Sequence, residues 1–305
     1  MKGWVECVPN FSEGRNSDVL ARLRQAIASV QGAVLLDETA DVDHNRSVFT
    51  FAGPPEPVGE ALLQAAAVAV ESIDLRSHQG CHPRIGALDV APFVPLNESD
   101  REAAVALARR MGEELWRRLR VPVYFYGDAA MSQARRLLED VRRGQFEGLS
   151  ERLPADIVRR PDIGGDVLHP TAGATAIGVR RFLIAFNVEL ETTDLAVARQ
   201  IARHVRQSSG GLPFVKALGL PLPSRGRTQV SMNLTNFEQT PLPAVFEAVR
   251  REAERLETKI ACSEIVGLAP RAALADTDFA ALRIEPSGRT VILEDRLAAL
   301  LDRGP

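Results

Sequence analysis

Several residue types that would narrow the class of this protein are scarce. The 305-residue chain has only three cysteines, Cys7, Cys81 and Cys262, which are far apart and form no CxxC pair. Neither a disulfide framework nor a thiolate zinc site is therefore expected. The first residues, MKGWVECVPN, lack the apolar stretch of a signal peptide, and the apolar run at 60–73 is too short to cross a bilayer. We therefore expect a cytoplasmic protein without membrane contact.

Positive charge is not in excess either. The formal net charge is -3 and the pI is about 6.0, so the chain has no basic field that would favour nucleic acid. Of the 37 lysines and arginines only those at positions 2, 216 and 259 are lysines, which leaves 34 arginines. A planar guanidinium binds carboxylates in a fork, so this pool suits an acidic substrate, although a GC-rich genome is the simpler explanation of the total.

The expected helices and strands follow the same order twice along the chain. Residues 4–94 and residues 182–268 each read strand, helix, strand, strand, helix, strand, which is the split βαβ or ferredoxin-like order. We therefore predict an α/β (α+β) protein with an N-terminal subdomain over 1–178 and a C-terminal subdomain over 179–305. A connector rich in proline and glycine, 144–178, precedes the second repeat. Helices on one face of each sheet leave the other face free to line a ligand cleft.

Local signals refine this pattern at two helix starts and one strand. Ser99 and Glu102 have the spacing of a capping box for a helix reaching residue 119, and Thr192 or Thr193 is expected to cap a later helix. Over residues 228–237 apolar side chains alternate strictly with hydrogen-bonding ones. The polar face of that strand is either solvated or the wall of a cleft.

Common catalytic motifs are missing. The sequence contains no Walker A motif, no GxGxxG after a strand and no GxSxG nucleophile elbow. The histidines are the next candidates to consider. His204 falls in an amphipathic helix and is expected to be structural or solvated, whereas His44, His78, His82 and His169 lie in loops.

His78 and His82 are four residues apart, the spacing of the zinc-binding HExxH motif. The glutamate of that motif is missing, and Gly80 and Pro83 argue against a continuous helix, so a metal site on this pair is disfavoured. A neutral histidine in a cleft can instead take and return a proton near pH 7. From composition and spacing alone, an ordinary loop histidine is the favoured interpretation at this point.

The segment 41–46, DVDHNR, is a second polar cluster. Its alternating carboxylates are compatible with a metal loop, but the distant glutamate of an EF-hand is absent. A turn rich in aspartate and asparagine between two strands explains the segment at least as well.

Several segments together resemble the formiminotransferase domain of glutamate formimidoyltransferases. They are VECVPNFSEG at 5–14, DHNR at 43–46, HPRIGALD at 82–89, TAGAT at 171–175 running into FLIAFN at 182–187, QVS at 229–231 and SEIVG at 263–267. The resemblance covers about residues 4–295. No cyclodeaminase domain follows in the sequence, so we expect a separate protein to deaminate the product.

The resemblance implies transfer of the formimino group from N-formimidoyl-L-glutamate to N5 of tetrahydrofolate, the co-substrate, by a homodimer. It also implies two sheets that face each other across an electropositive tunnel. His82 matches the family's catalytic base. The stretch implied to bind folate comprises Gly164, Gly165, Asp166, Val167, Leu168, His169, Pro170, Thr171, Ala172 and Gly173.

The two substrates carry several carboxylates, which are costly to desolvate unless they are paired. Arginines are therefore expected near the reacting groups, and the candidates are Arg46, Arg84, Arg180 and Arg227. No metal is expected, because the amidine is already activated. Three alternatives remain: formyl transfer between glutamate and 5-formyltetrahydrofolate, a metal-dependent amidohydrolase using His44, His78 and His82, and a folate-binding protein without catalysis.

Overall fold

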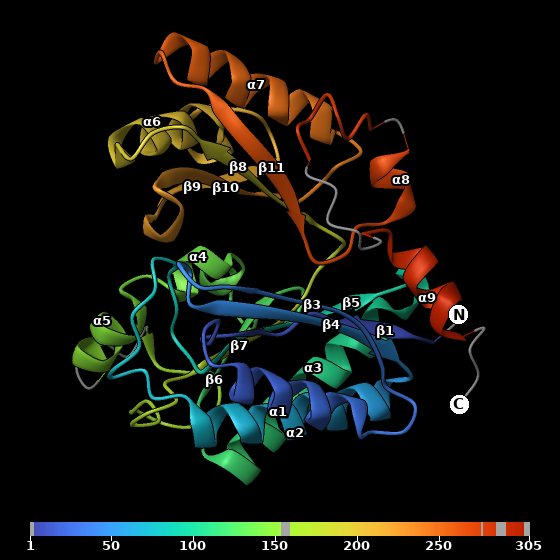
Figure 1. Ribbon diagram of the computed structural model, residues 1–305. Coiled ribbons are helices and arrows are strands. Elements are labelled where there is room, and N and C mark those ends of the chain that lie inside the picture. Colours follow the sequence, from blue (N-terminus) through green and yellow to red (C-terminus); the bar gives the residue numbers. More distant parts are fainter. Residues whose placement is uncertain (1–2, 154–158, 276, 285–290, 302–305) are drawn as a thin grey trace. The chain divides into compact units, whose positions relative to one another are not determined.

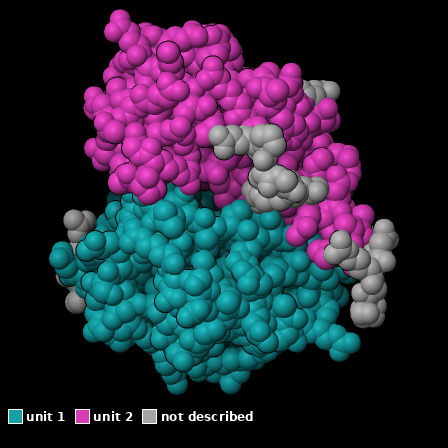
Figure 2. Space-filling model, in the orientation of Figure 1, with its two compact units in different colours: residues 1–181 teal, residues 182–305 magenta. Residues whose placement is uncertain are grey.

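The computed structural model describes residues 3–153, 159–275, 277–284 and 291–301. The chain divides into two compact units, unit 1 over Met1–Arg181 and unit 2 over Phe182–Pro305 (Figures 1 and 2). Each unit has its own sheet and its own hydrophobic core. No described helix is both long enough and apolar enough to span a membrane.

Unit 1 is built on a seven-stranded sheet. Its elements are β1 (Val5–Cys7), β2 (Asn10–Phe11), α1 (Ser17–Ala28), β3 (Val34–Asp41), β4 (Arg46–Gly53), α2 (Pro55–Ser72), β5 (Leu88–Pro95), α3 (Arg101–Leu119), β6 (Val123–Gly127), α4 (Leu138–Val141), α5 (Gln145–Arg152) and β7 (Thr175–Val179). β1 and β2 both pair with β4 on one side and β5 on the other, and β3 pairs with the outer edge of β4. This part has the predicted ferredoxin-like order, with antiparallel neighbours throughout.

The two remaining strands extend that sheet. β7 runs parallel to β5, and β6 runs parallel to β7. The connector expected at 144–178 therefore contains a helix, α5, and runs into β7, the strand next to the sheet edge, neither of which the sequence pattern indicated. A five-residue apolar strand among prolines and glycines gives too weak a local signal, because its pairing depends on partners far away in the chain.

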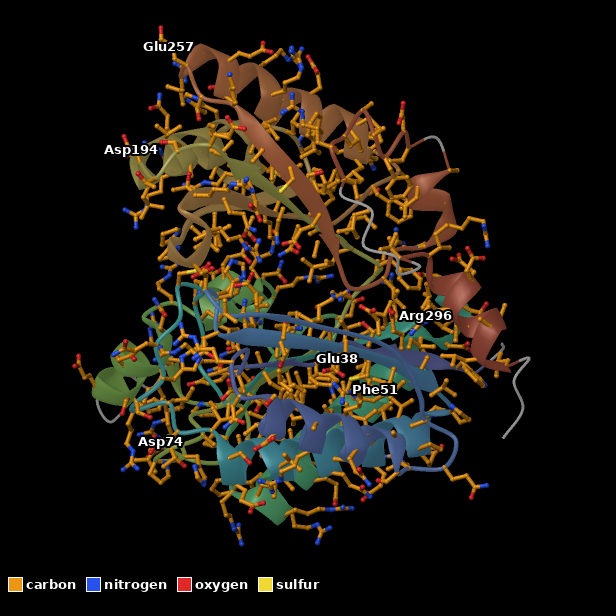
Figure 3. All side chains as sticks on the ribbon, in the orientation of Figure 1. Glu38, Phe51, Asp74, Asp194, Glu257 and Arg296 are labelled. Atoms are coloured by element: carbon orange, nitrogen blue, oxygen red, sulfur yellow. The ribbon has the colours of Figure 1, made fainter. Side chains whose placement is uncertain are left out.

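Helices α1, α2 and α3 cover one face of this sheet (Figure 1). α1 begins because the Asn16 side chain accepts hydrogen bonds from the amides of Asp18 and Val19, and it buries Val19, Leu23 and Ile27 along one stripe. From the sheet side, Phe49 and Phe51 of β4 are fully buried in the same core, and Figure 3 labels Phe51. The α4–α5 segment packs on the opposite face, where Tyr124 and Tyr126 belong to a second, smaller cluster.

Unit 2 is a four-stranded antiparallel sheet in the order β11-β8-β10-β9. Its elements are β8 (Ile184–Leu190), α6 (Leu195–Val205), β9 (Val215–Leu222), β10 (Arg227–Leu234), α7 (Leu242–Arg255), β11 (Ile260–Val266), α8 (Arg271–Leu274) and α9 (Leu293–Leu301). The strand order is again that of a ferredoxin-like fold, so the predicted repetition of βαββαβ is confirmed. The apolar residues of β10 are buried in the core, as their alternation predicts, and α6 and α7 pack together over it.

Two predicted helix caps are wrong. Ser99 lies in a 3-10 turn over Glu98–Asp100, and Asp100 is the N-cap residue of α3, without a side-chain capping bond. In unit 2 the N-cap of α6 is Asp194, which Figure 3 labels. Its carboxylate accepts the amide of Ala196, while the Thr192 hydroxyl accepts the amide of Asp194. In both cases a carboxylate close to the predicted cap takes the position at the positive end of the helix.

Candidate active site

His82 lies in a loop of unit 1 that runs from the end of α2 to the start of β5. This loop is fastened to the turn between β3 and β4. The Cys81 amide donates to the Asp43 carbonyl at 3.1 Å, and the Asn45 side-chain amide donates to the Gln79 carbonyl at 3.1 Å. A Cβ at Gly80 would lie 2.2 Å from the His44 carbonyl oxygen, so only glycine allows this close approach.

The turn between β3 and β4 is held by Asp41. Its Oδ1 accepts the backbone amides of Asp43 at 2.9 Å and His44 at 2.7 Å. Of the two interpretations open for segment 41–46, the turn rich in aspartate and asparagine is therefore the one observed.

Arg84 fixes the other side of the loop. Its guanidinium forms a forked ion pair with Glu147 of α5, at 2.7 and 2.9 Å, and its Nε donates to Nδ1 of His78 at 3.1 Å. His78 Nε2 lies 2.9 Å from the carbonyl oxygen of Asn45, which only accepts. His78 therefore carries its proton on Nε2, and both ring nitrogens are engaged. These two hydrogen bonds indicate that His78 has a structural role, and they leave no lone pair of its ring for a metal.

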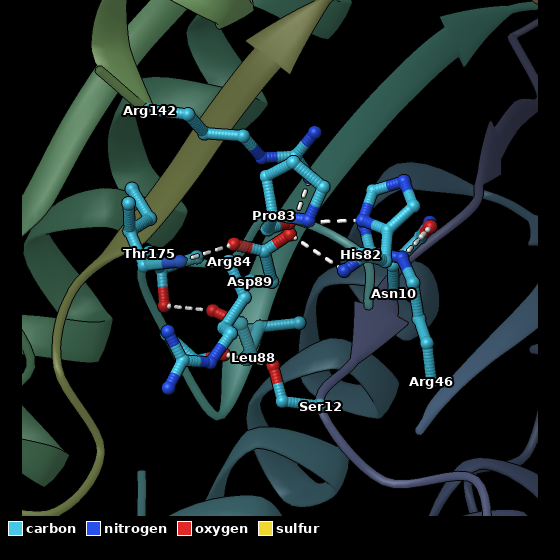
Figure 4. Close-up of polar contacts among 12 residues, drawn as sticks. Asn10, Ser12, Arg46, His82, Pro83, Arg84, Leu88, Asp89, Arg142 and Thr175 are labelled. Carbon is cyan, nitrogen blue, oxygen red and sulfur yellow. Dashed lines mark hydrogen bonds and ion pairs between the residues drawn. The ribbon is translucent and has the colours of Figure 1, made fainter. Parts of the chain in front are cut away.

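His82 is poised differently. Its Nδ1 lies 2.9 Å from the carbonyl oxygen of Pro83, so the proton of the neutral ring sits on Nδ1 and the lone pair on Nε2 (Figure 4). Burial, together with the charges of Arg46, Arg142 and His44, lowers the pKa of His82 well below its usual value, against an opposing effect of Asp89. The imidazole is therefore neutral at pH 7, and its Nε2 is a base. The residue is half-buried, so solvent reaches part of it.

A buried ion cluster lies beside this ring. Asp89, at the start of β5, has no exposed surface, and its Oδ2 accepts from Arg46 at 2.7 Å and from Arg142 (Figure 4). Its Oδ1 accepts the backbone amide of Ile85 at 2.8 Å. Burial alone would raise the pKa of Asp89, but the two guanidinium groups outweigh it and lower the pKa to about 2. The carboxylate is therefore ionised at neutral pH.

Two further side chains complete the surroundings of His82. The His44 ring is buried, and its centroid is 5.7 Å from that of His82. Asn10 of β2 accepts from Nε of Arg46 at 3.1 Å. Sequence reasoning did not assign a role to Arg142, which is 53 residues from Asp89 and outside every motif. The Asp89 position was visible as the last residue of HPRIGALD, but its partners were not.

The stretch expected to bind folate is divided by its surroundings. Its C-terminal end is hydrogen-bonded to the His82 loop. The Ala87 amide donates to the Ala172 carbonyl, and the Ala174 amide donates to the Ile85 carbonyl, both at 2.9 Å. Nδ1 of His169 accepts the amide of Ala172 at 3.0 Å and so closes a tight turn. The earlier residues, 165–167, are exposed. The stretch thus has one fixed end beside the His82 loop and one open end.

The four arginine candidates have different partners. Arg46 and Arg84 are buried and paired with Asp89 and Glu147, and Arg227 of unit 2 is paired with Glu189 at 2.9 Å. Arg180 follows β7 and forms no ion pair within the described part of the chain; its Nη1 donates to the Arg181 carbonyl oxygen at 2.9 Å. In the same part of the chain no three His, Cys, Asp or Glu residues are grouped to hold a metal ion.

Comparisons with known proteins identify the family of this chain. The N-terminal subdomain of the formiminotransferase domain matches residues 4–180, and the formiminotransferase domain matches residues 185–300. The chain belongs to the formiminotransferase family. Its members include a glutamate formimidoyltransferase of Streptococcus pyogenes serotype M1, 43% identical over 92% of this chain and 94% of that protein. A glutamate formimidoyltransferase of Thermoplasma acidophilum is 43% identical over 96% of this chain and 97% of that protein.

Longer formiminotransferase proteins also match. The formimidoyltransferase-cyclodeaminase of Rattus norvegicus is 44% identical over 90% of this chain but only 52% of its own length. The present chain therefore matches the formiminotransferase relatives in S. pyogenes and T. acidophilum over nearly their whole length, and the rat protein over about half of it.

Proposed function

We propose that this protein is a glutamate formimidoyltransferase, which transfers the formimino group of N-formimidoyl-L-glutamate to N5 of tetrahydrofolate. The products are 5-formimidoyltetrahydrofolate and L-glutamate. Family membership and the names of the full-length relatives support this reaction. The observation that carries the proposal is the state of His82, a neutral imidazole whose Nδ1–H is bound to the Pro83 carbonyl and whose Nε2 is therefore basic.

The reaction needs two proton movements at one carbon. N5 of tetrahydrofolate attacks the amidine carbon, and the new C–N bond gives a tetrahedral centre bearing three nitrogens. Nε2 of His82 takes the proton from N5. The imidazolium then returns a proton to the glutamate nitrogen, the bond from that nitrogen to carbon breaks, and the neutral imidazole is restored. One positioned imidazole of this kind contributes typically about 10²–10⁴-fold to the rate.

We also propose that the folate lies against Gly164–Gly173. The support is its position: hydrogen bonds fix the end of this stretch to the loop that carries His82, while residues 165–167 remain exposed. Tetrahydrofolate bound there has its reacting ring close to the base. Holding both substrates in line removes much of the entropy cost of a bimolecular reaction.

The decisive experiment mixes the purified protein with tetrahydrofolate and N-formimidoyl-L-glutamate and follows 5-formimidoyltetrahydrofolate. The wild type should form it, and His82→Asn should lower kcat about 10²–10⁴-fold, the range expected for one general acid–base group. His204→Asn is a matched control, because His204 lies on an exposed helix of unit 2, paired with Glu252, and should keep full activity. Absence of product in the wild type, or equal rates for His82→Asn, would contradict the proposal.

The same mixture with N-formyl-L-glutamate tests formyl transfer, which uses the same proton movements.

We further propose that the enzyme works in the cytoplasm as a homodimer. None of the three cysteines is part of a disulfide, which fits a reducing compartment. Light scattering during gel filtration would give a dimer mass if the homodimer is right and a monomer mass if it is wrong.

A further inference from the structure

The ion cluster beside His82 carries an unbalanced charge. Asp89 supplies one negative charge, whereas Arg46 and Arg142, which both contact it, supply two positive ones. The side chains of all three are 15% exposed or less. A buried charge without a counterion is costly, so a cluster of this composition is suited to receive one further anion.

The two arginines are not equally able to receive it. Arg46 uses Nη1 for Asp89 and Nε for Asn10, and its side chain is 9% exposed. Arg142 contacts Asp89 through Nη2, and its buried Nε has no hydrogen-bond partner among the residues that the structure describes. At 15% its side chain is also the more open of the two. A guanidinium with unused donors binds a carboxylate in a fork, so the incoming anion belongs on Arg142.

We infer that Arg142 binds the α-carboxylate of the glutamate moiety of the donor, and that Asp89 is the positioning residue that holds the Arg142 guanidinium beside His82. This inference rests on the proposed function. The α-carboxylate is chosen because it is attached to the same carbon as the nitrogen that His82 must protonate. An arginine in the ion cluster beside His82 is placed for this near carboxylate rather than for the γ-carboxylate at the other end of the molecule (Figure 4).

Binding there also serves the proton transfer. Without an anion, the charges of Arg46 and Arg142 oppose the imidazolium form of His82, and Asp89 and the neighbouring His44 are the other groups that act on the ring. A bound carboxylate cancels the excess positive charge. His82 therefore becomes a stronger base only when the donor is in place.

The test uses Arg142→Gln, Arg142→Lys and a matched control. Arg143→Gln is that control, because Arg143 is the next residue, is 67% exposed and is paired with Asp140. In Arg142→Gln, Asp89 keeps Arg46 as its partner, so the variant should fold, and thermal unfolding checks this. Arg142→Lys keeps the positive charge but loses the pair of parallel N–H donors that a guanidinium offers to a carboxylate.

Loss of a charge-assisted contact of this kind corresponds to about 10–100-fold in affinity. Arg142→Gln should raise the KM for N-formimidoyl-L-glutamate and the Kd for L-glutamate by that factor, with the KM for tetrahydrofolate within about twofold. Arg142→Lys should show a smaller loss, and Arg143→Gln none. The effect of Arg142→Gln on binding should persist for L-glutamine, which keeps the α-carboxylate, and vanish for the α-amide L-isoglutamine.

Three results would overturn the inference: unchanged glutamate affinity in Arg142→Gln, a raised KM for tetrahydrofolate in place of the donor, or an equal effect with isoglutamine. These results are distinct from a failure of the proposed function. If the wild type forms no product but binds glutamate through Arg142, the transfer reaction is wrong and the carboxylate site stands. If the wild type forms product and Arg142→Gln has the same affinity for glutamate as the wild type, only the carboxylate site is wrong.

Discussion

Each of the two sheets holds a buried carboxylate between two arginines, and the two arrangements differ in how far water reaches the arginines. Asp89 of unit 1 is paired with Arg46 and Arg142, whose side chains are 9% and 15% exposed. Glu189 of unit 2 is paired with Arg225 and Arg227, which are both 38% exposed. Solvent screens the second pair, whereas the charges of the first act on each other and on His82 through a poorly solvated interior.

The polar residues around these two carboxylates also differ between the units. In unit 2 the residues of β8 and β10 that face away from the helices include the neutral hydrogen-bonding side chains Asn187, Ser231 and Asn233. In unit 1 the charged side chains of Arg46, Asp89 and Arg142 are gathered beside the His82 imidazole, in the loop before β5. Two copies of one fold therefore offer different chemistry, and groups that exchange protons near neutral pH are expected to act in unit 1.

The largest effect on stability is expected from Asp89→Asn. Removing this carboxylate leaves two buried guanidinium groups without an anion and should lower the free energy of unfolding by about 3–5 kcal/mol. Glu189→Gln should cost only about 1 kcal/mol, because its arginines remain hydrated. Urea denaturation of both variants gives the comparison, and equal losses would remove the distinction between the two clusters.

A second contrast concerns two glycines with positive φ, one in each unit. A Cβ at Gly173, φ +69, would lie 2.1 Å from the Ile85 carbonyl, whereas at Gly226, φ +61, it would meet nothing within 4 Å. Gly226→Ala should cost about 1–2 kcal/mol of backbone strain. Gly173→Ala adds about 1–3 kcal/mol of overpacking. Similar melting temperatures for the two variants would show that the fold does not depend on this contact between the His82 loop and the folate stretch.

The loss of unfolding free energy at acid pH should also distinguish the Asp89 cluster from the Glu189 cluster. The pKa of Asp89 is lowered in the folded protein to about 2, so its contribution is complete above the unfolded pKa of about 4 and is lost as the pH falls through about 2. Unfolding free energies measured between pH 5 and pH 2 should therefore fall less steeply for Asp89→Asn than for the wild type. Glu189→Gln serves as the control for a carboxylate outside the His82 cluster. A wild-type slope in Asp89→Asn would mean that the pKa of Asp89 is not depressed.

The smallest effect is expected at the rim of unit 1. Glu147 forms a forked pair with Arg84, but its side chain is 59% exposed. Glu147→Gln should therefore change the free energy of unfolding by no more than about 1 kcal/mol. A loss as large as that of Asp89→Asn would show that the Arg84 anchor depends on the ion pair rather than on its contacts within the loop.

Much of the fold could be predicted from the sequence, because apolar periodicity and turn residues are local signals. They gave the βαββαβ order in both units and the buried face of β10. The parallel strand β7 was not predicted, since five residues in a connector carry no pattern of their own. The role of Arg142 was not predicted either, because its contact with Asp89 joins positions 53 residues apart. His82 was found by motif, but its tautomer depends on the carbonyl of Pro83 and required coordinates.

The most direct test of the account is an NMR titration of the His82 ring in the free enzyme, with its signals assigned by comparison with His82→Asn. We predict a pKa well below 6.5 and, at pH 7, a neutral ring protonated on Nδ1. A pKa at or above 6.5, or a neutral ring protonated on Nε2, would contradict the claim that His82 is the base of this enzyme.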